Sequence, residues 1–123
     1  MARSENQKQK VLALLDILKK NTDDEHGITM VQIISELESK GIKAERKAIY
    51  ADINVLKEYG FDIQGNKESG TYYYKLIHRS FELSELKLLV DAVQASKFIS
   101  QKRSNELIKK IEDQASKYQA CLL

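Results

Sequence analysis

Residues 45–77 read ERKAIYADINVLKEYGFDIQGNKESGTYYYKLI, and the periodicity of the apolar side chains changes within this segment. Its first half has the i, i+4, i+7 spacing of one helix face, which predicts an amphipathic helix over residues 45–59. The apolar residues of that face are Ile49, Ile53 and Leu56. Gly60 directly follows and is expected to end the helix.

The second half of the segment predicts a β-hairpin over residues 61–77. Residues 61–64 alternate apolar and polar side chains, as in a half-buried strand. Residues 65–70 are polar and glycine-rich, so we expect a loop there. Residues 71–77 are rich in tyrosine and β-branched residues, which favours the return strand.

Two further helices are expected before this segment. Residues 5–20 have an amphipathic pattern, and residues 30–40 have a second one. Thr29 and Gln32 have the spacing of a capping box at the start of the second helix. Gly41 follows that helix as a stop signal. Two helices joined by a short turn favour a helix-turn-helix.

The end of the chain is expected to be helical over residues 83–99 and 101–118, with Ser100 capping the second of these helices. The first is apolar on more than one side and the second has a narrow apolar stripe, a combination that favours a homodimer. The residues expected at the dimer contact are Leu86, Leu89, Val90, Val93, Ile108 and Ile111.

The predicted fold class is mainly α with a small β-hairpin, in the order of a winged helix-turn-helix followed by two C-terminal helices. Residues 1–79 form the predicted winged domain, and residues 80–123 form a helical dimerisation or linker segment. The chain has 123 residues, and 42% of them are hydrophobic, enough for a modest core.

Composition excludes two classes of protein. No apolar run approaches the roughly 20 residues of a membrane-spanning helix. A single cysteine, Cys121, cannot form an internal disulfide.

The polar N-terminus has no signal-peptide pattern, so a cytoplasmic location is expected. The net charge of +2 permits nucleic-acid binding without requiring it.

The helix at 45–59 has a second face suited to DNA. Arg46, Tyr50 and Asn54 are spaced by four residues and share one stripe. Arginine can contact guanine O6 and N7 with two hydrogen bonds, and asparagine can do the same for adenine. Lys47 is expected to contact phosphate. The alternative is an ordinary solvated helix face, and the hairpin that follows favours the DNA interpretation.

Four further residues are candidate DNA contacts. Lys57 lies on the same helix, and Lys67 lies near the tip of the hairpin. Thr29 and Gln32 start a helix whose N-terminal N–H groups are able to meet a phosphate, although a capping role alone explains both residues.

No catalytic or metal-binding pattern is found. His26 and His78 are far apart in the sequence, and with one cysteine they do not make a zinc-ligand pattern. There is no phosphate-binding glycine loop. We therefore expect no enzymatic activity, no metal and no cofactor.

The segment 46–53, with arginine, tyrosine, aspartate and isoleucine in the order R-x-x-x-Y-x-D-I, resembles the recognition helix of DeoR-like winged-helix domains. It is most similar to the N-terminal domain of bacterial WYL-domain transcriptional regulators. The run 60–63, a glycine at position 70 before tyrosines, and the segment 81–89 extend the resemblance over roughly residues 5–119.

The resemblance implies a bacterial, sequence-specific regulator that binds double-stranded DNA as a homodimer, with residues 45–59 in the major groove and the hairpin on the backbone or minor groove. The family often has arginine where this chain has Ala51. It usually continues into an effector domain, so we expect this chain to be either an N-terminal fragment or a shortened relative without that domain. An unknown effector would bind that missing domain. A winged-helix protein-interaction module without DNA binding is the alternative function.

Overall fold

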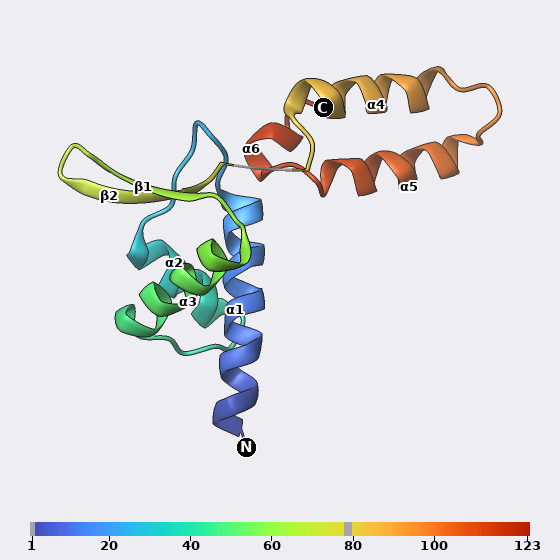
Figure 1. The fold of residues 1–123 in the computed structure, drawn as a ribbon. Coiled ribbons are helices and arrows are strands. Elements are labelled where there is room, and N and C mark those ends of the chain that lie inside the picture. The colour runs from blue at the N-terminus through green and yellow to red at the C-terminus, as the bar shows by residue number, and fades with distance from the viewer. Residues whose placement is uncertain (1, 78–79) are drawn as a thin grey trace. The chain divides into compact units, whose positions relative to one another are not determined.

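The computed structural model describes residues 2–77 and 80–123, and it divides into two compact units, residues 1–78 and 79–123. Within the described residues the chain forms six helices and one two-stranded antiparallel sheet (Figure 1). The prediction of a mainly helical chain with a small hairpin is therefore confirmed. The sheet and three of the helices belong to the first unit, and the other three helices belong to the second.

The helical part of the first unit consists of α1 (Ala2–Asn21), α2 (Met30–Ser39) and α3 (Arg46–Tyr59). The predicted capping box is present: the Thr29 N–H donates to Gln32 Oε1 (2.9 Å), and the Gln32 N–H donates to Thr29 Oγ1 (3.2 Å). Glu45 has extended backbone and is the N-cap of α3, which therefore begins one residue later than predicted. Helix α3 ends at Gly60, whose φ of 127° favours glycine.

The hairpin consists of β1 (Ile63–Glu68) and β2 (Thr71–Leu76). The predicted loop over residues 65–70 is wrong, because the strand continues through these polar residues almost to the turn. Only Ser69 (φ 50°) and Gly70 (φ 82°) connect the strands. Two consecutive positive φ values give the tight turn that matches the twist of a hairpin.

The polar stretch of β1 contains a glycine that is covered by an aromatic ring of β2. Gly65 lies opposite Tyr74, and the ring of the neighbouring Tyr72 crosses the space that a side chain at Gly65 would fill. A Cβ added at Gly65 would clash with the Tyr72 hydroxyl oxygen. The aromatic ring thus shields a glycine that has no side chain of its own to pack.

The loop before α2 also joins the sheet. Ile28 and Tyr74 form an isolated antiparallel bridge, with N–H···O distances of 2.9 and 2.8 Å. Gly27 permits this approach, since a Cβ there would lie 2.7 Å from the Cβ of Tyr73. The sequence analysis expected no such pairing before α2.

Thr22, just after α1, connects the same strand to the helix. Its hydroxyl donates to the Leu18 carbonyl (2.6 Å) and accepts from the Leu76 N–H (2.9 Å). Both Thr22 and Leu76 are buried. The base of the hairpin is therefore held at two positions, by this side chain and by the Ile28 bridge.

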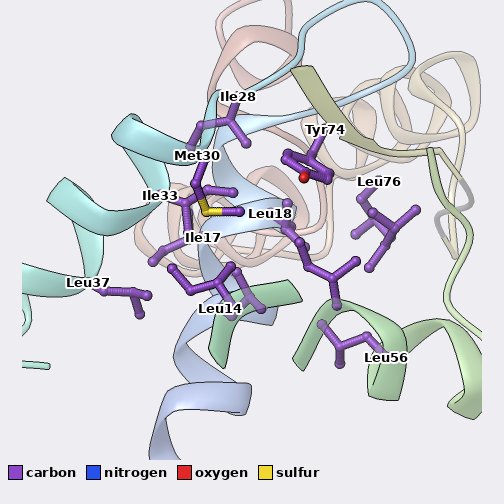
Figure 2. Close-up of a cluster of buried hydrophobic side chains, with 13 residues drawn as sticks. Leu14, Ile17, Leu18, Ile28, Met30, Ile33, Leu37, Leu56, Tyr74 and Leu76 are labelled. Atoms are coloured by element: carbon purple, nitrogen blue, oxygen red, sulfur yellow. The ribbon is translucent and has the colours of Figure 1, made fainter. Parts of the chain in front are cut away.

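A single hydrophobic core lies between the three helices and the base of the hairpin (Figure 2). Its members come from α1, α2, α3, both strands and the loop before α2. They are Leu14, Ile17, Leu18, Ile28, Met30, Ile33, Leu37, Ile49, Ile53, Leu56, Ile63, Tyr74 and Leu76. The predicted inward face of α3 is confirmed by the burial of its three apolar residues.

The second unit consists of α4 (Leu83–Ala95), α5 (Gln101–Glu112) and α6 (Lys117–Ala120). Helix α4 ends four residues before the predicted end at residue 99. Ser100 caps α5 as predicted, by accepting a hydrogen bond from the Arg103 N–H (3.2 Å). Ser116 starts a separate helix by accepting from the Gln119 N–H (3.1 Å). One helix over residues 101–118 and a fold with only two C-terminal helices are therefore both wrong.

Candidate nucleic-acid interface

Helix α3 has an exposed polar side opposite its buried one. Within the first unit, Arg46, Lys47, Tyr50, Asn54 and Lys57 are all exposed, whereas Ile49, Ile53 and Leu56 face the core. Tyr50 is 44% exposed. The five side chains expected to contact DNA on this helix thus share one accessible side, and none of them is consumed in the core.

Tyr50 lies where α3 meets the hairpin. Its side chain interacts with that of Tyr74 on β2, which is only 8% exposed. Burial, followed by the charge of Tyr50 and the hydrogen bond to it, raises the pKa of Tyr74 to about 12, while nearby Arg46 acts in the opposite direction.

One face of the hairpin continues from this joint toward the turn. Lys67 on β1 lies opposite Tyr72 on β2, and Tyr72 packs edge-on against Tyr74 with ring centroids 5.1 Å apart. Alternate residues of a strand share a face, so Lys67, Tyr72 and Tyr74 line the same side. The side chains of Lys67 and Tyr72 are exposed. Figure 1 shows the hairpin extending past the helices of its own unit, with the turn at its far end.

The side of α3 next to α1 has an ion pair that was not predicted from the sequence. Lys10 on α1 and Asp52 on α3 are largely buried, and Lys10 Nζ lies 3.4 Å from Asp52 Oδ2. No other hydrogen-bond partner of that oxygen is present among the described residues. The pair joins α1 to α3 and removes one acidic charge from the exposed side of α3. The pairing of residues 42 positions apart has no local signal.

The other expected DNA contacts are arranged differently. The side chains of Thr29 and Gln32 are hydrogen-bonded in the capping box described above. Only backbone groups at the start of α2 are therefore left to contact a phosphate. On the hairpin, Lys75 lies 3.9 Å from Glu68, whereas Lys67 is on the other face. Lys67 and Lys75 therefore differ in both face and ion pairing.

The residues expected at a dimer contact fall into two groups. Leu86 and Val90 are buried within the second unit, where α4 packs against α5, so their apolar side is the internal one. Val93, Ile108 and Ile111 are partly buried there. Leu89, which was expected on the same side as Leu86 and Val90, is exposed. Leu88, expected on the second apolar side of α4, is exposed as well. The dimer itself remains a prediction.

Across residues 2–77 and 80–123, no group of three or more His, Cys, Asp or Glu side chains is placed to hold a metal ion. His26 contacts Asp23 through Nδ1 at 2.8 Å, His78 lies outside the described residues, and Cys121 is exposed. No helix in the described part has the length and apolar character needed to cross a membrane.

No family model, curated protein or solved structure matches the chain. Within the first unit, the surface of α3 and the hairpin combines an exposed helix face, Tyr50 beside Tyr74, and a strand pair with an exposed lysine.

Proposed function

We propose that this chain is a sequence-specific transcriptional regulator that binds double-stranded DNA. Helix α3 is the recognition helix of a winged helix-turn-helix and enters the major groove, and the hairpin is the wing. This is the function implied by the resemblance to the DNA-binding domain of bacterial WYL-domain regulators, for which a cytoplasmic location is expected.

The observation that carries the proposal is the exposed polar side of α3 in the same unit as a hairpin whose exposed Lys67 lies on the face of Tyr72 and Tyr74. A helix of 14 residues is about 20 Å long, and the major groove is about 12 Å wide, enough to admit it. A rigid helix beside a projecting strand pair can thus contact a groove and the adjacent backbone together.

The proposed roles follow from side-chain chemistry. Arg46 and Asn54 contact base edges, where a guanidinium suits guanine and an amide suits adenine. Tyr50 donates a hydrogen bond to an acceptor on the DNA. Lys47 and Lys57 on α3 hold phosphates, since lysine is a compact positive charge.

Three further contacts complete the proposed interface. Lys67 on the wing meets the backbone or the minor groove. The N–H groups after Thr29 and beside Gln32 at the start of α2 face a phosphate. We also propose a homodimer built by the second unit, which would place two half-sites about 34–36 Å apart, or a multiple of that distance.

A salt titration tests the proposal. Binding of the full chain to a fluorescent random duplex is measured by anisotropy from low to moderate salt. Three lysine–phosphate contacts per subunit predict that log K falls with log salt with a slope of roughly −3 for one bound subunit, or roughly −5 for the proposed homodimer. Lys67→Gln should reduce the slope by about 1 for each bound subunit. Lys75→Gln, the matched control on the other hairpin face, should leave the slope unchanged.

The outcomes separate the two candidate functions. Affinity that falls with salt, together with a tighter duplex recovered from a random pool, supports a sequence-specific regulator. Absence of duplex binding even at low salt contradicts the proposal and favours the protein-interaction module.

A further inference from the structure

The middle of the exposed side of α3 is apolar. Ala51 and Val55 are one turn apart, both are exposed, and Val55 is 50% exposed. Since Ile53 and Leu56 face the core, the helix period places Ala51 and Val55 on the outward side. Neither residue belongs to the core of the first unit.

Polar side chains border this apolar strip. Lys47 precedes Ala51 by one turn, Asn54 lies beside Val55 in the sequence, and exposed Glu58 follows Val55 by about one turn. Polar side chains therefore lie before, beside and after two short ones that have no hydrogen-bonding atom. A helix with short residues on its outermost line can approach a surface more closely there than at its edges.

The chemistry of the strip limits what it can recognise in a major groove. The edges of guanine, adenine and cytosine present donors and acceptors there, whereas thymine adds an apolar C5-methyl group. Alanine and valine can only pack, so the matching group is a pyrimidine C5-methyl. Donors and acceptors left facing these side chains would lose water without gaining a partner.

We propose that Ala51 and Val55 determine specificity by packing on C5-methyl groups of thymines in the bound duplex. This inference rests on the DNA-binding function proposed above. It names a component of the recognised sequence: thymine at one or two positions facing the centre of α3. Arg46 and Asn54 would then read neighbouring bases by hydrogen bonds.

The test removes the methyl groups one at a time. The full chain is used to select a tight duplex from a random pool, and each thymine is then replaced by uracil, which differs only by the C5-methyl. Burial of one methyl predicts roughly fourfold weaker binding at a sensitive position, which corresponds to about 0.8 kcal/mol. Two sensitive positions replaced together predict a loss of roughly 15-fold.

Variants connect the effect to these side chains. Val55→Ala and Ala51→Ser should each reduce the difference between thymine and uracil at one position. Leu12→Ala is the control, because Leu12 on α1 is also an exposed apolar residue (67%) outside the proposed interface, and the difference should persist in it. If cytosine is placed at the sensitive position, 5-methylcytosine should bind more tightly than cytosine.

The outcomes distinguish this inference from the proposed function. Specific binding that is equal for thymine and uracil duplexes overturns the inference and leaves the regulator proposal standing. A uracil effect of equal size in the parent, Val55→Ala and Ala51→Ser also overturns it, because the methyl would then act through other residues or DNA shape. Absence of duplex binding overturns both.

Discussion

Replacing Thr22 with valine removes the hydroxyl that links the end of α1 to β2 and keeps the shape of the side chain. The Leu18 carbonyl retains the backbone hydrogen bond from the Thr22 N–H (3.1 Å), so it stays paired. The Leu76 N–H loses its acceptor, the Thr22 hydroxyl at 2.9 Å. Because both residues are buried, water cannot easily replace that acceptor.

A buried amide left without a partner costs about 1–3 kcal/mol. We therefore expect Thr22→Val to lower the free energy of unfolding by about that amount. For a domain of this size each kcal/mol shifts Tm by roughly 4–8 °C, so the expected decrease in Tm is about 5–20 °C. Urea and thermal unfolding followed by far-UV circular dichroism measure both quantities.

The matched control is Thr71→Val, the same substitution at an exposed position of the same strand. It should change the free energy of unfolding by less than about 0.5 kcal/mol, because water solvates the groups around it. A Thr22→Val protein as stable as the parent would refute the reasoning, and so would an equal loss in the control.

Three further substitutions test other contacts. Gly27→Ala should destabilise the fold by about 1–3 kcal/mol in urea unfolding, because the new Cβ would lie 2.7 Å from the Cβ of Tyr73, which is attached to the β2 backbone; unchanged stability contradicts this close approach. Because the pKa of Tyr74 is raised, its contribution to stability is complete below pH 10 and is lost as the pH rises toward 12. The parent should therefore lose more stability than Tyr74→Phe above pH 10. Parallel curves of unfolding free energy against pH would contradict the assignment. Lys10→Met should cost about 1–3 kcal/mol by leaving Asp52 without its cation, whereas adding Asp52→Leu should recover most of that loss; additive effects in the double-mutant cycle would show that the pair is not coupled.

The parts of the fold that were predicted from the sequence are those with local signals. Thr29 and Gln32 are three residues apart, and their capping box forms as expected. Gly60 ends α3 because the positive φ there suits glycine. The hairpin itself was predicted from the alternation of its residues, but its length was not, since residues 65–68, which were expected in the loop, pair with residues 71–74.

Two helix boundaries in the C-terminal unit were also predicted wrongly. The apolar pattern continues beyond Ala95, but the backbone of Ser96 is extended and α4 ends there. Ser116 was read as part of a helix, whereas its side chain caps a new one. The two-sided pattern of α4 was visible, but the sequence could not tell which side packs internally against α5.

For the candidate interface, the sequence predicted which residues of α3 would be exposed but not what holds them. The outward positions of Arg46 and Asn54 follow from helix periodicity alone. The bond between Tyr50 and Tyr74 and the pairing of Lys10 with Asp52 join distant segments. Such contacts depend on tertiary packing, so no spacing within one element indicates them.

The two attachments of β2, at Tyr74 and at Leu76, give the hairpin a gradient of local stability. Opening the strand pair at its base requires breaking bonds to the loop before α2 and to Thr22 at the same time, whereas opening at Ser69 and Gly70 breaks neither. Amide hydrogens near the turn should therefore exchange with solvent long before those at the base. The turn can fray and re-form while the rest of the hairpin keeps its orientation on the helices.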